Sequence, residues 1–594
     1  MKIKLGIIIL HCLFFSNICF AETNKITTSQ FRFTILHTND LHSHFLGTGP
    51  DAAFTPQQND GDPVLGHYAR LASVISREKG YKSALHEPVL LLDAGDFFSG
   101  TLFHALAPSG KTNLTPELQF FSDQKYDAVN IGNHEFDAFE SGFAHMLRKA
   151  YVANLNIPIV SSNIEFDQSP SDLKEIFATN SQISRSQIHT LKKDDAELRV
   201  GIVGFLGPDA ALVSSGTRKN SHFKGFKDAK QKKDTDEFYE HARIVAQELK
   251  LKNKAQIIIA LLHGGAPEDK NLLQKVPEID IVIAGHTHQR ETYVYDNRII
   301  AQAGSYGEWL GKLELNVDLP LNLKKSETFQ SNKYKVSLLN SDVHLKIDDS
   351  VASDSRTLKK IAEASSALES LKVTGNFLPN SPILNLIHDF PKERMHHNKL
   401  GQLICDSILN SLNKRLNTPA ALYFTSQSLL REGLLRAKNA PTLLQFSDIF
   451  RIMSVGFDDD LNPGSPITMF YLTPQDFKKV IQFTDVYSKI STHFMPAFSS
   501  NVSYKIHNWG IPFLNRVTDF KLNNLDFEQW PALIPIATSM YVARYFEKVP
   551  SLSYGLLNIV PRDKNGLPLK NLEPAIREKE AVLLAEEFKR LGTL

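Results

Sequence analysis

Short apolar runs rich in β-branched residues recur through the first half of the chain, and longer polar or amphipathic stretches separate them. The runs are FTILHT, VLLLDAG, AVNIG, PIVSSN, RVGIVGF, IIIALLHGG, IDIVIAGH and IIAQAG. The stretches between them include residues 65–79 and 234–250. Strands that are apolar on both faces and alternate with helices are typical of layered α/β proteins. The pattern therefore predicts an α/β domain over residues 30–345.

A connecting helix and a second domain are expected after this region. Ser353 and Asp354 can cap a helix, because apolar residues recur behind them at helical spacing. These apolar residues are Leu358, Ile361, Ala364, Leu368 and Leu371. We expect residues 346–376 to link the first domain to a second one over residues 377–594. That second region mixes short strands with predicted helices at 400–412 and 474–483.

Length and charge narrow the class of protein. The chain has 594 residues, of which 42% are hydrophobic, so a mainly disordered or fibrous protein is excluded. Its 66 Lys and Arg residues nearly balance 65 Asp and Glu residues, for a net charge of +1. A protein that grips a nucleic-acid polymer is normally far more basic. A small phosphorylated substrate remains compatible, since it needs only a local positive site.

The N-terminus has the layout of a secretory signal peptide over residues 1–21. Lys2 and Lys4 precede an apolar stretch, and the residues CFA end the segment in the form of a cleavage site. The alternative is an N-terminal membrane anchor, but the apolar run is short for a bilayer. We expect cleavage before Glu22 and a mature chain without a membrane span.

The number and positions of the cysteines indicate the compartment in which the protein works. Two of the three cysteines lie in the predicted signal, which leaves Cys405 alone. An exported chain with one thiol has no internal disulfide. We therefore expect a bacterial periplasmic or secreted protein.

Polar side chains with metal-binding chemistry follow several of the apolar runs. Sites in layered α/β proteins form at the carboxyl ends of strands. A single histidine there is usually a hydrogen-bonded structural residue, but five strand ends together indicate one shared site. Buried carboxylates and imidazoles cost free energy unless something compensates them, and a pair of divalent cations does so. The residues are Asp40, His42, Asp96, Asn133, His134, Asp137, His263, His286 and His288.

Two cations that share Asp96 account for most of this set, since one carboxylate can bridge two ions. Asp40, His42, Asp96 and His288 can surround one ion, and Asp96, Asn133, His263 and His286 the other. Oxygen and nitrogen ligands without thiolate suit Zn, Mn, Fe, Mg or Ca. The residues leave the identity of the ion open.

A dimetal site of this kind is suited to phosphoryl chemistry. Two cations polarise a phosphoryl group and lower the pKa of a bound water, which supplies hydroxide for in-line attack on phosphorus. His134 follows ligand Asn133, and Asp137 can hold its imidazole oriented and protonated near the leaving oxygen. The alternative for His134 and Asp137 is a pair that caps a helix N-terminus.

The segments HTNDLH, AGDFFSG, GNHEFD, HGG and GHTH occur in this order. With them the chain resembles the calcineurin-like metallophosphoesterases, and more narrowly the 5′-nucleotidase family of exported two-domain enzymes. The resemblance implies a four-layer α/β sandwich followed by a C-terminal α/β domain of the 5′-nucleotidase type. It also implies the seven metal ligands given above, with His134 and Asp137 as the catalytic dyad.

The resemblance continues more loosely into the second region. KLGQLICDSILNSL resembles the first C-terminal helix of the family. FTSQSLLREG lies where relatives carry Asn-Gly-Gly-Gly-Ile-Arg, and only the arginine remains, as Arg431. Because arginine binds phosphate or carboxylate through two parallel hydrogen bonds, we expect Arg431 and Arg394 to bind substrate. The alternative for Arg431 is a surface salt bridge.

Relatives stack the nucleobase between two aromatic side chains, and this chain departs from that arrangement. Val455 stands at the first such position, with Phe457 two residues on. Tyr541 is the candidate for the second, although the Gly-Gly-Asp that follows in relatives is absent. The resemblance makes Phe457 and Tyr541 candidate substrate-binding residues. The alternative for Tyr541 is core packing.

The resemblance implies an exported dimetal phosphohydrolase that releases phosphate from nucleoside 5′-phosphates, with a small-molecule nucleotide as its substrate. Other substrates of similar enzymes stay open: 2′,3′-cyclic nucleotides, nucleotide-sugar pyrophosphates, or a sulfate ester on a thiol carrier. A surface or secreted binding protein with a vestigial metal domain is the alternative of another class.

Overall fold

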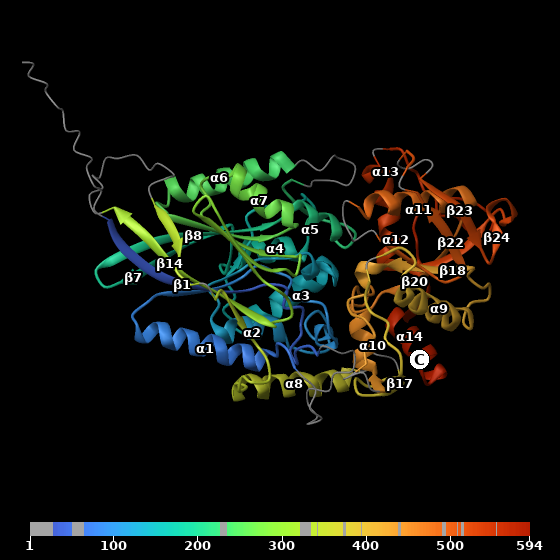
Figure 1. Ribbon diagram of the computed structural model, residues 1–594, viewed down its shortest axis with the longest axis horizontal. Coiled ribbons are helices and arrows are strands. Elements are labelled where there is room, and N and C mark those ends of the chain that lie inside the picture. Colours follow the sequence, from blue (N-terminus) through green and yellow to red (C-terminus); the bar gives the residue numbers. More distant parts are fainter. Residues whose placement is uncertain are drawn as a thin grey trace, which may run out of the picture.

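The computed structural model describes most of the chain after residue 27 and places it in two lobes (Figure 1). The predicted signal peptide, residues 1–21, and Arg394 lie outside the described residues. The described ranges are 28–49, 64–225, 235–320, 334–340, 342–371, 376–393, 395–436, 441–489, 495–507, 509–511, 516–553 and 555–594. Within them, the helices lack the combination of length and apolar content that a membrane span needs.

Two sheets build the first lobe. An eight-stranded sheet has the order β15 (Lys335–Leu338), β14 (Trp309–Pro320), β1 (Thr28–Thr38), β2 (Val89–Asp93), β3 (Ala128–Val129), β4 (Ile159–Val160) and β6 (Ile183–Ser184), with β16 (His344–Lys346) beside β14. A six-stranded sheet has the order β12 (Arg290–Tyr295), β13 (Arg298–Ala303), β11 (Ile281–Gly285), β10 (Ile257–His263), β8 (Ala196–Leu206) and β7 (Ser186–Lys193). Each apolar run of the sequence pattern contributes a strand.

The two sheets pack face to face, and helices cover their outer faces. Ile35 of β1 and Ile259 of β10 belong to one buried cluster between the sheets. Helices α1 (Tyr68–Ala84), α2 (Pro116–Gln124) and α3 (Phe139–Val152) cover the first sheet. Helices α6 (Thr235–Leu251) and α7 (Ala266–Lys275) cover the second (Figure 1). The predicted four-layer α/β sandwich is confirmed.

The predicted connecting helix is α8 (Ser355–Leu371), which packs against α1, α2 and the short helix η1 (Leu102–Ala105). Asp354 caps it by accepting hydrogen bonds from the backbone N–H and the hydroxyl of Thr357, both at 2.7 Å. Ile361 and Leu368 are buried, as expected. Leu358 is 40% exposed, so it lies outside the apolar face to which the spacing assigned it.

The second lobe is a smaller α/β domain. Its five-stranded sheet has the order β21 (Pro496–Phe498), β18 (Leu422–Ser426), β25 (Ile534–Ser539), β20 (Pro466–Leu472) and β26 (Pro574–Lys579). Helices α9 (Lys399–Asn413), α11 (Pro474–Tyr487) and α14 (Glu580–Leu591) flank it. The caps explain two of the starts: Asn398 accepts from Gly401 N–H, and Thr473 accepts from Asp476 N–H before Pro474.

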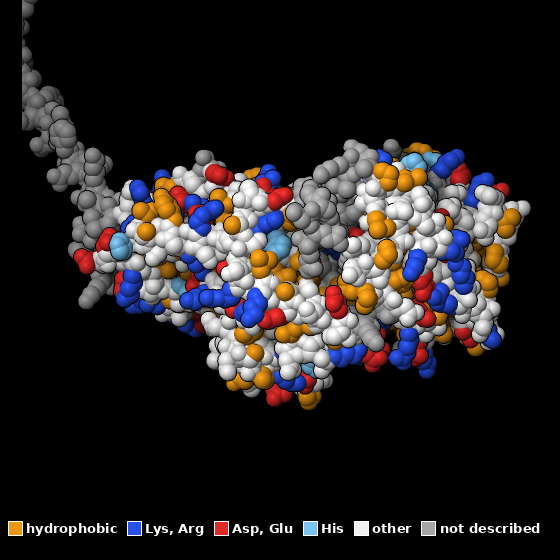
Figure 2. All heavy atoms as spheres, turned by 90° about the horizontal axis from the view of Figure 1, so that it is seen from below, with side chains coloured by type: hydrophobic (Ala, Val, Ile, Leu, Met, Phe, Trp, Pro, Cys, Tyr) orange, Lys and Arg blue, Asp and Glu red, His pale blue; other side chains and the backbone are white. Residues whose placement is uncertain are grey.

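Shorter elements complete the two lobes. They are β5 (Ile164–Phe166), α4 (Asp172–Thr179), α5 (Pro208–Val213), β9 (Ser221–Phe223), β17 (Pro382–Leu386), β19 (Thr442–Gln445), α10 (Phe446–Ile452), β22 (Val502–Ile506), β23 (Val517–Leu522), β24 (Leu525–Asp526), α12 (Met540–Ala543), η7 (Arg544–Lys548) and α13 (Val549–Leu552). On the face of the molecule seen in Figure 2, acidic and basic side chains are interspersed over both lobes, in keeping with the near-zero net charge.

The first residue of α14 makes the stability of the second lobe depend on pH. Burial raises the pKa of the Glu580 carboxyl from 4.5 to about 7, although hydrogen bonds with Tyr423 and Ser539 oppose the rise. Between these two pH values the folded protein keeps a proton that the unfolded chain has released. The free energy of unfolding therefore falls as pH rises through this window, by at most about 1.4 kcal/mol per pH unit.

Glutamine cannot ionise, so Glu580→Gln should leave the melting temperature unchanged at pH 4.5. At pH 8 it should raise the melting temperature above that of the wild type. Thermal unfolding at both pH values measures this. Glu578→Gln, at an exposed position, serves as the control. If the melting temperatures of Glu580→Gln and the wild type differ by the same amount at both pH values, the raised pKa of Glu580 is contradicted.

Candidate metal centre

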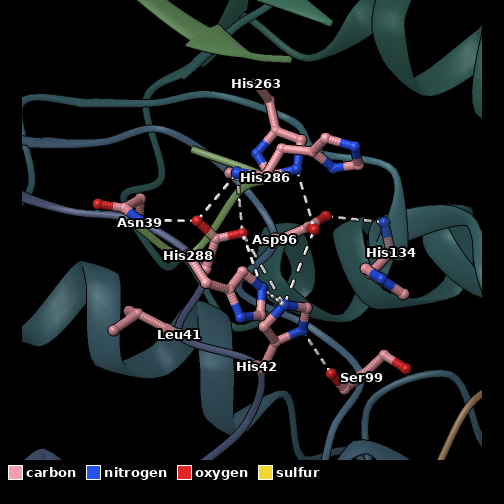
Figure 3. Close-up of polar contacts among 12 residues, drawn as sticks. Asn39, Leu41, His42, Asp96, Ser99, His134, His263, His286 and His288 are labelled. Carbon is pink, nitrogen blue, oxygen red and sulfur yellow. Dashed lines mark hydrogen bonds and ion pairs between the residues drawn. The ribbon is translucent and has the colours of Figure 1, made fainter. Parts of the chain in front are cut away.

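The strand-end residues converge at one edge of the sandwich, between the two sheets (Figure 3). The loop after β1 meets the loop after β11, where the backbone N–H of His286 lies 3.0 Å from both carboxylate oxygens of Asp40. The loop after β2 meets the end of β10, where Asp96 Oδ2 lies 2.9 Å from His263 Nε2. Parallel pairing of β1 with β2 and of β10 with β11 puts these carboxyl ends together.

The convergent side chains form groups with ligand atoms close enough to hold metal ions. Asp40, His42 and His288 form one group, and Asp96, His263 and His286 form another. His42 also lies close to Asp96, with Nε2 3.8 Å from Oδ2, so the Asp96 carboxylate lies between the groups. Six of the seven predicted ligands thereby belong to these two groups, and Asn133 directly precedes His134, whose backbone N–H donates to Asp96 Oδ1 at 2.8 Å.

Hydrogen bonds set the tautomers of two of the imidazoles. His42 Nδ1 lies 2.6 Å from the Ser99 carbonyl oxygen, and His263 Nδ1 lies 2.9 Å from the Ala94 carbonyl oxygen. Each Nδ1 therefore carries a proton and donates it, so Nε2 is the ring atom that is directed at the cluster. A metal-binding histidine is normally held by such a second hydrogen bond.

The buried polar atoms of the two groups suit cation binding. His42 Nε2 faces His288 Nε2 at 3.2 Å, and His42 Nε2 already presents a lone pair there. Asn133 Oδ1 is buried and makes no hydrogen bond to any described residue. His263 Nε2 lies 2.9 Å from Asp96 Oδ2, and this carboxylate raises the pKa of the imidazole to about 10 although burial opposes the rise, so a bound cation would replace the proton between them. A cation bound by these atoms would compensate their burial. The donor set therefore fits divalent ions with oxygen and nitrogen ligands.

The backbone at the site adopts an uncommon conformation. Asp40, His42, Asp96, His286 and His288 all have positive φ, between 50° and 81°. Non-glycine residues enter this left-handed region at a cost, and they cluster at functional sites. A close approach adds a further constraint, because a Cβ at Gly132 would lie 2.2 Å from Asp96 Oδ1.

A buried carboxylate fixes the loops that carry these residues. Glu135 accepts hydrogen bonds from the backbone N–H groups of Asp96, Gly132 and Phe98, at 3.1, 2.6 and 3.1 Å. The loop after β2 and the loop after β3 are thereby tied to the same side chain. The sequence pattern gave no role to Glu135.

Burial and charge favour the ligand forms of several groups. Burial opposes ionisation of Asp96, but the charge and the hydrogen bond of His263 outweigh it and hold the pKa of that carboxyl well below its usual range. Burial and the nearby Arg431 guanidinium hold the pKa values of His42 and His288 well below the usual range. Asp96 is therefore anionic and both imidazoles are neutral, which are the forms that bind a metal.

The predicted dyad lies beside the cluster. His134 Nδ1 is 2.7 Å from Asp137 Oδ2, which also accepts a hydrogen bond from the Ser99 hydroxyl at 2.7 Å. Arg431 Nη2, from the second lobe, lies 2.9 Å from His134 Nε2. Because a guanidinium only donates, His134 Nε2 accepts here and the ring is neutral. The protonated state expected from the sequence requires the guanidinium to move away.

Comparison of the chain with models of known protein families agrees with the order of the motifs and with this geometry. Residues 33–290 match the model of the calcineurin-like phosphoesterases. The chain carries a calcineurin-like phosphoesterase domain. Enzymes of this family use two divalent metals, and the histidine and aspartate groups of this domain can hold such ions.

Curated relatives share the domain at modest identity. The chain is 27% identical over 413 residues to a snake venom 5′-nucleotidase of Crotalus adamanteus, covering 66% of this chain and 60% of the relative. It is 29% identical over 333 residues to the trifunctional nucleotide phosphoesterase protein YfkN of Bacillus subtilis, covering 52% of this chain and 19% of the relative. The chain thus spans less than two thirds of the length of these relatives.

Solved structures show the same two-domain fold. A 5′-nucleotidase precursor from Thermus thermophilus has a TM-score of 0.67 at 18% identity and covers 95% of this chain and 97% of its own. A 5′-nucleotidase from Candida albicans has a TM-score of 0.60 at 13% identity, with 95% and 99% covered. At these identities the likeness shows the fold: a phosphoesterase domain followed by a C-terminal α/β domain.

Three residues that the sequence pattern did not single out also contact the histidines in and around the metal centre. Asp209, after β8, lies with Oδ2 3.3 Å from His286 Nε2. Tyr306 stacks on His44 at 4.0 Å between ring centroids. Glu432, next to Arg431 in the second lobe, lies 3.9 Å from His44 Nε2. These contacts join distant parts of the sequence, and no local motif announces them.

The predicted substrate-binding residues divide between cavity and core. A cavity of about 120 Å³ between the lobes is lined by His134, Arg431 and Tyr541, among others. Phe457 is fully buried, stacks near Phe98 at 5.7 Å and does not line this cavity. Arg394 lies outside the described residues.

Proposed function

We propose that this protein is a metal-dependent phosphohydrolase that releases inorganic phosphate from nucleoside 5′-phosphates. The observation that carries the proposal is the convergence of Asp40, His42, His263, His286 and His288 around Asp96, with the Nε2 atoms of two of the imidazoles directed at the cluster. The names of the relatives supply the nucleotide as substrate class. We also propose the seven predicted ligands and the His134–Asp137 dyad as the working site.

Two divalent cations, when bound, would polarise the phosphoryl group and activate a water molecule for attack on phosphorus. The chain's own residues complete the site. Asp96 supplies the negative charge that both groups share. Arg431 can exchange its hydrogen bond with His134 for the phosphate oxygens, which a guanidinium binds through two parallel hydrogen bonds.

His134 then acts near the leaving oxygen. Asp137 orients its ring through Nδ1, so that Nε2 faces the site once Arg431 has turned to the phosphate. Nε2 can hold a proton there and stabilise the charge that develops on the ester oxygen. The alcohol leaves with a proton, and water provides the new oxygen of the phosphate.

A phosphate-release assay tests the proposal. The purified protein is incubated with the nucleoside 5′-phosphates, and separately with 2′,3′-cyclic nucleotides and nucleotide sugars, with added Mn, Zn, Mg or Ca. We expect release from the 5′-phosphates, its loss with a chelator, and its return with excess metal. Release that persists after complete metal removal, or no release from any nucleoside 5′-phosphate, would contradict the proposal.

We further propose that the protein is exported to the periplasm or secreted, as the pattern of residues 1–21 indicates. The mature N-terminus would then be Glu22. N-terminal sequencing of the protein from the periplasm or culture medium tests this.

A further inference from the structure

The cavity between the lobes connects the metal centre to an apolar pouch in the second lobe. His134 and Arg431 line the cavity on the side of the metal centre. Strand β18, helix α11 and the segment α12–η7–α13 provide most of the remaining wall. Six wall residues are apolar and at least 93% buried: Phe424, Val480, Phe483, Phe546, Val549 and Ile559.

Apolar atoms make up most of the cavity wall, and the polar side chains among its described lining residues are serines, threonines, tyrosines, Asn133, His134 and Arg431. Thr425 Oγ1 is buried there without a hydrogen-bond partner. The Tyr545 hydroxyl donates to the Val213 carbonyl oxygen of the first lobe. Among the described lining residues there is no aspartate or glutamate to accept the two hydroxyls of a ribose.

This wall suits an apolar group better than a nucleobase. The edge of a base carries several nitrogen and oxygen atoms, and each one buried against these side chains without a partner weakens binding about 5- to 150-fold. An apolar group gains instead, by about fourfold for each methylene that leaves water.

We infer that the pouch binds the alkyl or aryl part of a phosphate monoester, so that the protein's substrates extend beyond nucleosides to the phosphates of small apolar alcohols. The inference rests on the proposed function for the hydrolytic step. In that step water forms the new bond to phosphorus, the bond from phosphorus to the ester oxygen breaks, and the alcohol leaves with a proton.

A homologous pair of esters tests the inference. Ethyl and butyl phosphate have similar leaving groups, so a difference between their KM values reports binding of the alkyl group. With the full-length protein and added manganese, we expect a KM for butyl phosphate at least about tenfold lower, since two further methylenes are buried. Equal KM values would overturn the inference while leaving the hydrolase intact.

Variants of the pouch give a second readout. Val480→Phe fills the pouch and should bring the ethyl-to-butyl KM ratio close to one. If the larger side chain prevents folding, Val480→Thr replaces it in the test. Threonine has nearly the same shape as valine but carries a hydroxyl, and it should lower the ethyl-to-butyl KM ratio several-fold. Val294→Phe, at a position 60% exposed on β12, should keep the wild-type ratio. An unchanged ratio in both Val480 variants would contradict the assignment.

A binding measurement separates this inference from the proposed function. If no ester releases phosphate, the proposed hydrolase fails, and calorimetry with ethylphosphonate and butylphosphonate decides the inference by itself. Tighter binding of butylphosphonate, lost in Val480→Thr, would support the pouch. Equal affinities would overturn it.

Discussion

Replacement of Asp96 with alanine should lower phosphate release by about 10³-fold or more. The Asp96 carboxylate lies 2.9 Å from His263 Nε2 and 3.8 Å from His42 Nε2, so it is the negative charge that both ligand groups share. A metal pair contributes several kcal/mol to stabilising a phosphoryl transition state. Since about 1.4 kcal/mol corresponds to a factor of ten in rate, losing this ligand removes most of the catalysis.

Metal content should fall with the activity. We expect the wild type to retain two ions per chain after dialysis and Asp96→Ala to lose at least one, as measured by elemental analysis. Asp195→Ala, at an exposed position between β7 and β8, is the matched control and should keep both ions. Because Asp96 Oδ1 also accepts a hydrogen bond from the His134 backbone, circular dichroism should confirm the fold of the variant. An Asp96→Ala protein with two ions and full turnover would contradict the bridging role.

His134→Ala should lower kcat by about 10²- to 10⁴-fold, the usual effect of losing a positioned proton donor. The imidazole is held by Asp137 at 2.7 Å and faces the cavity where the ester oxygen would leave. It is at the margin of the ligand groups, so the metal content and the melting temperature should remain close to those of the wild type.

The measurement separates two roles for this residue. Steady-state kinetics and metal analysis are compared for the wild type, His134→Ala and His388→Ala, whose histidine is exposed in the second lobe. Unchanged kcat in His134→Ala would exclude a catalytic role. Loss of an ion would instead make His134 a ligand, since its ring centroid lies 5.0 Å from that of His42 and it also groups with Asp96.

The first domain could be predicted because its signals are local. An apolar run such as IIIALLH becomes β10 with every residue buried, and its last residue, His263, necessarily emerges at the carboxyl end of the strand. Parallel pairing then brings such ends together whatever lies between them in the chain. The same logic predicts an α/β layering in which the sheets are buried on both faces, whereas the four layers were implied by the resemblance.

The substrate side could not be predicted in the same way, because it depends on how the lobes meet. Arg431 was singled out for its charge, but its hydrogen bond to His134 arises only from packing across the interface. Phe457 has an aromatic ring that could stack on a nucleobase, but this ring packs against Phe98 and His104 instead. The left-handed backbone at Asp40 and His42 could not be predicted either, since only a few per cent of non-glycine residues adopt it, although Asp and His do so more often than most.

The attachment of two loops to the Glu135 carboxylate has a consequence for how this chain can diverge. Three backbone groups, from Asp96, Phe98 and Gly132, must arrive at one side chain at hydrogen-bond distance. Adding or deleting even one residue between β2 and Phe98, or between β3 and Glu135, would move one of them out of reach. Descendants of this sequence should therefore differ freely in the length of the turn between β7 and β8, while these two short connections keep a constant number of residues.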